Sequence, residues 1–74
     1  MTAGGLVAAE IRRLRLARGW TQVQLGAALG WSQQAVAKLE RDDANPGVDT
    51  LAKVARALGA HLVIDLRTVE EPPR

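Results

Sequence analysis

The sequence predicts a mostly α-helical fold, in which four short helices are followed by one short C-terminal β-strand. Apolar residues recur every three or four positions over residues 7–58, which is the period of amphipathic helices. Glycines at positions 19, 30 and 59 stand where three of these stretches end. Residues 60–66 change to a two-residue period, which is typical of a strand. With 74 residues, the chain is expected to form one domain over residues 1–66, followed by a flexible acidic tail over residues 67–74.

The first helix is predicted by the spacing of Val7, Ile11 and Leu14, which places all three on one side of a helix. Gly19 is expected to end this helix, because glycine adopts the positive φ of a helix C-terminus without a steric cost. Arginines surround the apolar positions, and we interpret Arg12 and Arg13 as part of a solvated face.

The second helix is expected to begin after Thr21, whose hydroxyl can cap the helix. Gln24 stands three residues later, where the side chain of a capping box returns to the cap residue. Leu25, Ala28 and Leu29 are expected to form the apolar side of this helix, which ends at the glycine in position 30.

The third helix is expected to begin after Ser32, a second hydroxyl cap, and to bury Val36 and Leu39. Two short helices separated by a tight turn that contains glycine form a helix-turn-helix candidate. Gly26 lies in the middle of the second helix, where it costs up to about 1 kcal/mol relative to alanine. We therefore expect the third helix to pass too close for a Cβ there. Trp31 is expected to fill the gap between these two helices.

A loop over residues 41–47 is predicted by Asn45, Pro46 and Gly47, which together break regular structure. A fourth helix follows over about residues 48–58 and ends at the glycine in position 59.

The predicted strand needs a partner, because a single short strand is unstable by itself and its edge remains unpaired. We expect it to pair with the same strand of a second subunit; the alternative is a terminal strand covered by its own chain. The residues assigned to dimerisation are Leu62, Val63, Ile64 and Leu66.

Composition excludes several classes of function. The chain contains no cysteine and one histidine, His61, so we expect no disulfide, no metal and no cofactor. It has no phosphate-binding glycine loop and no constellation of paired carboxylates, so an enzyme is not expected. It shows neither a basic leader nor an apolar run long enough to cross a bilayer, which indicates a cytoplasmic protein that does not associate with membranes.

Charge is distributed unevenly along the chain. Residues 1–41 contain six basic and two acidic side chains, a net charge of +4, whereas residues 42–74 contain four basic and six acidic ones, a net charge of −2. The first part can therefore face a polyanion more easily than the second.

The adjacent glutamines Gln33 and Gln34 are expected to lead the exposed side of the third helix. A recognition helix enters the major groove of DNA with its N-terminal side chains first, and a glutamine amide can pair with both N6 and N7 of adenine. Lys38, one turn later, can reach a guanine edge or a phosphate, and Gln22 can contact a phosphate from the start of the second helix. The alternative is that these residues form an ordinary solvated face.

The stretch "IRRLRLARGWTQVQLGAALGWSQQAVAKLER" resembles the Cro/repressor-type, or XRE-like, helix-turn-helix domains. In that family Gly26 would replace the more common alanine, and Trp31 a smaller apolar residue. The resemblance implies a structural ion pair between an arginine late in the first helix and a glutamate that ends the recognition helix. The residues at these two positions are Arg15 and Glu40, and the expected phosphate contacts are Gln22, Ser32, Arg41 and Asn45.

A narrower resemblance covers "PGVDTLAKVARALGAHLVIDL", which is similar to the C-terminal part of the HipB- and HigA-type antitoxins. It implies a homodimeric repressor that binds an inverted-repeat operator on double-stranded DNA. It also implies a type II toxin–antitoxin operon, with a HipA-like kinase or a HigB-like ribonuclease as the toxin. Two alternatives remain open, a free-standing XRE-type regulator and a protein-interaction module that has lost DNA binding.

Overall fold

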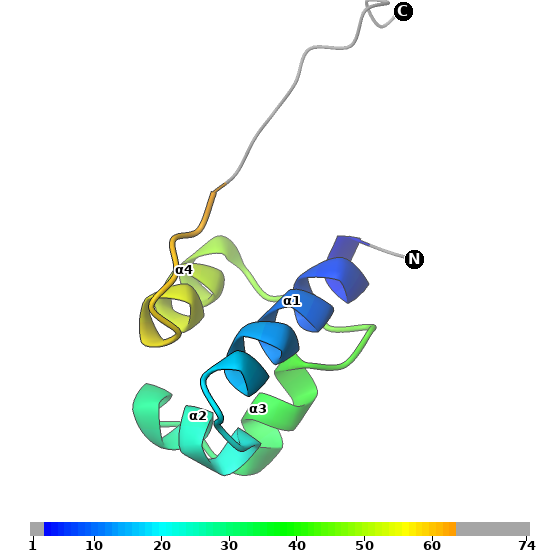
Figure 1. Cartoon of the computed structure of the whole chain (residues 1–74). Coiled ribbons are helices and arrows are strands. Elements are labelled where there is room, and N and C mark those ends of the chain that lie inside the picture. Colours follow the sequence, from blue (N-terminus) through cyan, green and yellow to red (C-terminus); the bar gives the residue numbers. More distant parts are fainter. Residues whose placement is uncertain (1–2, 64–74) are drawn as a thin grey trace, which may run out of the picture.

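The computed structural model describes residues 3–63, and every regular element within this range is an α-helix. The four predicted helices are confirmed (Figure 1), with bounds α1 Ala3–Ala17, α2 Gln22–Leu29, α3 Gln33–Leu39 and α4 Val48–Ala57. No helix in this part of the chain has the length and apolar character needed to cross a membrane.

The predicted helix boundaries rest on hydrogen bonds that the structure contains. The Thr21 hydroxyl oxygen accepts the backbone N–H of Gln24 at 3.1 Å, and the Thr21 N–H donates to the Gln24 side chain at 2.8 Å, which completes the capping box. Ser32 caps α3 by accepting the N–H of Ala35 at 3.1 Å. Gly30 ends α2 with φ 74°, in the left-handed region that favours glycine. The Thr21 cap fixes the start of α2, and Gly30 with the Ser32 cap fixes the length of the turn between α2 and α3.

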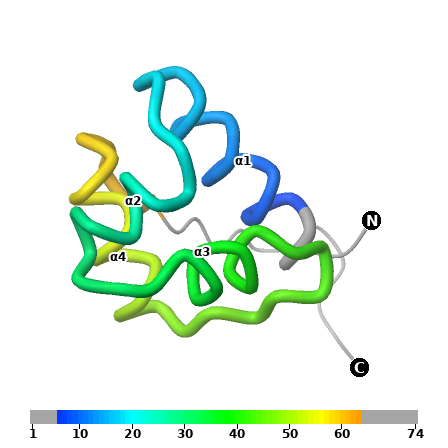
Figure 2. The backbone as a smooth tube through the Cα atoms, turned by 90° about the horizontal axis from the view of Figure 1, so that it is seen from below, coloured from blue at the N-terminus to red at the C-terminus, as the bar shows by residue number. Residues whose placement is uncertain are grey.

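One apolar core joins all four helices. Figure 2 shows that the loop after α3 turns back along that helix before it reaches α4. The buried apolar side chains come from each helix and from the end of α4; they are Ala8, Ile11, Leu25, Leu29, Val36, Leu39, Val54 and Leu58. Because α2 buries Leu25 and Leu29 here and α3 buries Val36 and Leu39, the glutamines Gln24, Gln33 and Gln34 are left on the surface.

The apolar side of α2 differs from the prediction at one position. Leu25 and Leu29 are buried as expected, but Ala28 is exposed, and Gly26 is buried in its place. The turn before α3 passes directly over Gly26, where a Cβ would lie 2.6 Å from the backbone oxygen of Trp31. The predicted close approach is therefore present, although its nearest atom belongs to the backbone of the turn rather than to α3.

Replacing Gly26 with valine is expected to destabilise the domain by about 2 kcal/mol or more, because the added side chain must push the turn away from α2. Ala27→Val is the matched control, since Ala27 is the exposed neighbour in the same helix. Thermal unfolding followed by circular dichroism measures both. Equal melting temperatures for the two variants would show that the space beside Gly26 is not needed.

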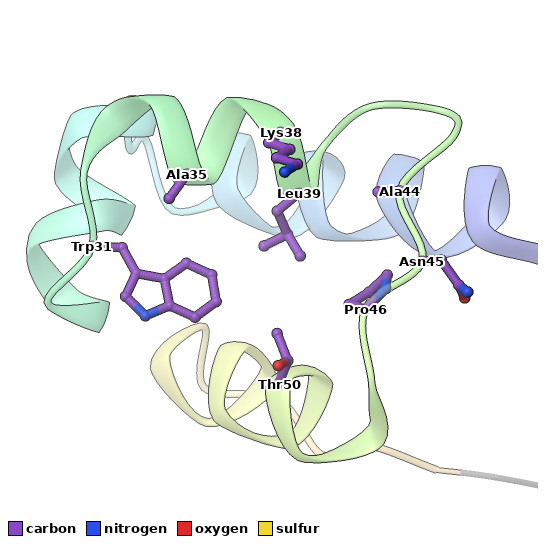
Figure 3. Close-up of a pocket in the computed structure, with 8 residues that line it drawn as sticks. All are labelled: Trp31, Ala35, Lys38, Leu39, Ala44, Asn45, Pro46 and Thr50. Atoms are coloured by element: carbon purple, nitrogen blue, oxygen red, sulfur yellow. The ribbon is translucent and has the colours of Figure 1, made fainter.

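Trp31 occupies a different gap from the predicted one. Figure 3 shows its ring directed into the space between α3 and α4, near Leu39, Pro46 and Thr50, which line a cavity of about 240 Å³ with it. The ammonium group of Lys53 in α4 lies 5.7 Å from the centre of the ring. Trp31 therefore supports α3 from the side of α4, whereas backbone contact at Gly26 closes the gap between α2 and α3.

The predicted strand is not found in the part that the structure describes. Residues 60–63 are irregular, and the remainder of the prediction, residues 64–66, lies outside the described residues. A strand exists only through hydrogen bonds to a neighbouring strand, and residues 3–63 of one chain contain no other strand with which it could pair.

Candidate nucleic-acid interface

The exposed side of α3 is polar. Gln33, Gln34 and Lys38 are all exposed, while Val36 and Leu39 on the opposite side are buried in the core. At 3.6 residues per turn, Gln34 lies in the middle of the exposed side, with Gln33 and Lys38 on either side of it. Lys38 borders the same cavity that Trp31 lines (Figure 3), and Gln33 lies on the side of α2. The helix thus presents two amides and one cation on a single surface.

The residues assigned to phosphate contacts flank this surface. Ser32 is exposed, and because its oxygen accepts the N–H of Ala35, its own hydrogen is left to donate. Asn45 is exposed in the loop after α3, and Figure 3 shows its side chain directed away from the cavity. Arg41 is also exposed, but its guanidinium lies 3.0 Å from the Asp43 carboxylate, so part of its charge is already balanced.

Arg15 and Glu40 form a bidentate ion pair. Arg15 Nε lies 2.7 Å from Glu40 Oε2, and Arg15 Nη2 lies 3.0 Å from Glu40 Oε1. The side chains are 8% and 4% exposed, so the pair is shielded from water. Arg15 Nη1 also donates to the backbone oxygen of Trp20 at 2.8 Å, which ties the end of α1 to the turn before α2. The hydrogen bonds that Arg15 donates to the Glu40 carboxylate raise the pKa of Arg15 above its ordinary value.

A chain of hydrogen bonds leads from this ion pair to the surface of α3. Glu40 Oε1 accepts a hydrogen bond from Gln22 Nε2 at 3.4 Å. Gln22 Oε1 in turn accepts one from Gln33 Nε2 at 2.7 Å. The side chain of Gln22 is therefore engaged with two residues of its own chain, and one of its amide hydrogens is left for a ligand.

Local patterns in the sequence did not indicate this chain of contacts. Gln22 and Gln33 are eleven residues apart and lie in different helices. Their contact depends on how α2 crosses α3, which in turn depends on the absence of a side chain at Gly26. The sequence feature that could have indicated this contact is a glutamine at the start of α2 and another at the start of α3, combined with a glycine inside α2.

The residues assigned to dimerisation are only partly visible. Leu62 and Val63 are exposed, and with apolar residues of α1 and α4 they line a groove of about 290 Å³. Ile64 and Leu66 lie outside the described residues. Within residues 3–63, no three acidic or histidine side chains come together as a metal site would require.

Comparison with known proteins gives a consistent result. A model of the helix-turn-helix family HTH_3 matches residues 11–64. The uncharacterized HTH-type transcriptional regulator y4dJ of Sinorhizobium fredii is 41% identical over 68 residues, which are 92% of this chain and 88% of that protein.

Two further relatives are longer. The immunity repressor protein of Bacillus phage phi105 is 43% identical over 53 residues, which are 72% of this chain and 37% of the repressor. The HTH-type transcriptional regulator SutR of Escherichia coli is 33% identical over 64 residues, which are 86% of this chain and 34% of the regulator. The chain thus corresponds to about a third of each of these two proteins.

Proposed function

The chain belongs to the helix-turn-helix family HTH_3, and from this premise we propose that it is a transcriptional repressor that binds double-stranded DNA at a specific sequence. The observation that carries the proposal is the polar side of α3, where Gln33, Gln34 and Lys38 are exposed while Val36 and Leu39 on the opposite side are buried. A helix that needed only solubility would not require paired neutral amides at its leading end. The names of the relatives, two regulators and one repressor, support the same function.

In this proposal α3 lies in the major groove. Gln33 and Gln34 pair with base edges, with adenine N6 and N7 as the preferred partners, and Lys38 contacts a guanine edge or a phosphate. Gln22, Ser32, Arg41 and Asn45 contact phosphates, which position the helix without selecting a sequence. Protection of one short segment in a footprinting experiment on the upstream DNA would support this function; uniform protection, or none, would contradict it.

We further propose that two copies bind together. Leu62 and Val63 are exposed, and a strand formed by Leu62, Val63, Ile64 and Leu66 in one subunit can pair with its copy in another. Two recognition helices related by a two-fold axis would contact half-sites about 34 Å apart, which requires an inverted-repeat operator. The domain would then comprise residues 1–66, with residues 67–74 as a tail that holds two arginines and two glutamates.

Replacing Ile64 with lysine is expected to convert the dimer into a monomer, because a charge would enter the apolar interface between the strands. Val48→Lys introduces the same charge at an exposed apolar residue at the start of α4 and serves as the control. Sedimentation equilibrium measures the mass. A dimer mass retained by Ile64→Lys would rule out this interface, and a monomer mass for the unmodified protein would rule out the dimer.

The similarity of the C-terminal part to HipB- and HigA-type antitoxins supports a more specific role. In that role the repressor controls its own operon in the cytoplasm, at the nucleoid, and neutralises a toxin such as a HipA-like kinase or a HigB-like ribonuclease. A free-standing regulator is the second candidate, favoured by the near-complete match to the regulator y4dJ. Co-expression with the product of the adjacent reading frame distinguishes them: rescue of growth and a stable complex support the antitoxin.

A further inference from the structure

Glu40 lies at the buried end of the hydrogen-bond chain that reaches Gln33, and its charge restricts how that chain can be arranged. A carboxylate only accepts hydrogen bonds, so Gln22 must present its amide nitrogen to Glu40 Oε1, as it does at 3.4 Å. The oxygen of Gln22 then faces α3 and requires a donor. Gln33 supplies one through its own nitrogen, 2.7 Å away.

A glutamine amide can rotate by half a turn about its last side-chain bond, which exchanges the places of its acceptor oxygen and its donor nitrogen. Here the negative charge of Glu40 decides the orientation of Gln22, and Gln22 decides that of Gln33. One hydrogen of Gln33 is committed to Gln22. Its oxygen and its other hydrogen remain free, and these are the acceptor and donor that adenine N6 and N7 require.

Arg15 holds Glu40 in this role. It donates to both oxygens of the carboxylate, at 2.7 and 3.0 Å, so the carboxylate cannot rotate away from Gln22 without losing the ion pair. Arg15 is itself fixed by the backbone oxygen of Trp20 at 2.8 Å. The hydrogen bonds that connect Gln33 through Gln22 to Glu40 therefore end at an ion pair that is held in place within the folded domain.

We propose that Glu40 is a specificity-determining positioning residue, which acts through Gln22 to fix the amide of Gln33 in the orientation that selects adenine. The proposal rests on the base contact assigned to Gln33 above. It assigns to the buried ion pair a second role beside stability, because the same carboxylate oxygen accepts from both Arg15 and Gln22.

The test compares binding of the full chain to its operator and to operators with one base pair changed. Gln33→Ala identifies the base pair at which Gln33 discriminates. At that base pair, Glu40→Gln is expected to lower the ratio of the affinity for the operator to the affinity for the changed operator by about fivefold or more. A change of this size lies within the free energy that one bidentate base contact contributes to discrimination. The neutral amide can donate as well as accept, so both orientations of Gln22 become possible. Gln22→Met removes the middle link without touching the ion pair and is expected to lower the ratio equally.

Two controls separate positioning from loss of stability. Leu58→Ala removes core volume in α4 and lowers the melting temperature, yet should leave the ratio unchanged, since Leu58 contacts none of these amides. Glu10→Gln makes the same chemical change at an exposed carboxylate that pairs with Arg13 in α1. If Glu40 served only the stability of the fold, Glu40→Gln would lower the melting temperature and leave the affinity ratio unchanged, as is expected for Leu58→Ala.

The double variants give the deciding result. If Glu40 acts through Gln33, then Glu40→Gln and Gln22→Met change the ratio no further when Gln33 is already alanine. Independent losses would overturn the proposal, and so would an unchanged ratio in the single variants Glu40→Gln and Gln22→Met. If Gln33→Ala reduced discrimination at none of the base pairs, the proposed contact between Gln33 and a base would be wrong.

A measurement without DNA tests the same link. In nuclear magnetic resonance spectra, one side-chain amide hydrogen of Gln33 is expected to exchange slowly with water, and this protection should fall in Glu40→Gln, where both orientations of Gln22 are possible. Identical exchange in the two proteins would contradict the positioning role.

Discussion

Replacing Arg15 with alanine is expected to cost about 3 kcal/mol or more of folding free energy, because it leaves the Glu40 carboxylate buried without its partner. It also removes the donor to the Trp20 carbonyl and thus the connection between α1 and the turn before α2. A domain of this size has only a small stability to lose, so the variant is expected to be largely unfolded near room temperature. Urea unfolding followed by circular dichroism measures the change.

The chain contains its own control for this prediction. Arg13 in the same helix pairs with Glu10, but those side chains are 63% and 55% exposed, and water can replace the lost contact. Arg13→Ala is therefore expected to unfold at nearly the same urea concentration as the unmodified protein. A second variant that replaces both Arg15 and Glu40 with apolar residues should recover much of the stability, since no buried charge is left. If Arg15→Ala were as stable as Arg13→Ala, the ion pair would not support the fold.

Replacing Gln33 or Gln34 with alanine is expected to weaken binding to the operator by about 1–3 kcal/mol each and to leave binding to random DNA nearly unchanged. Base contacts are made only at the correct sequence, whereas phosphate contacts are made at both. Fluorescence anisotropy with the two duplexes measures the difference.

Arg41→Ala is the matched comparison, because Arg41 is exposed beside the same surface but is assigned to a phosphate. It is expected to weaken binding to both duplexes alike and to reduce the salt dependence. Equal losses on operator and random DNA for the two glutamine variants would mean that these amides do not contact bases.

Much of the fold follows from short-range chemistry. Thr21 and Ser32 cap helices because a hydroxyl oxygen at these points satisfies a free backbone N–H, which any reader of the sequence can anticipate. Gly30 ends α2 for an equally local reason, its positive φ. Ala28 was assigned wrongly because alanine is small enough for either side of a helix, so its position in the pattern decides little.

What the sequence could not supply depends on contacts between distant segments. Trp31 was expected between α2 and α3, but the course of the loop after α3 places α4 within its reach. The contact between Gln22 and Gln33 follows from the crossing of two helices, and neither residue alone predicts it. A strand at residues 60–66 forms only through hydrogen bonds to a partner strand, and residues 3–63 contain no other strand that could supply them.

The most direct test of the central claim is a titration of the purified protein against a duplex from its own promoter and a random duplex of equal length, at about 50 and about 200 mM salt. The two exposed amides and the one cation on the surface of α3 predict tighter binding to the promoter duplex at both salt concentrations. A fall in affinity of roughly a hundredfold between the two concentrations is expected for a dimer in which Lys38 and Arg41 of both subunits neutralise phosphates. Failure to bind either duplex at the lower salt concentration, or equal affinity for both, would contradict the account.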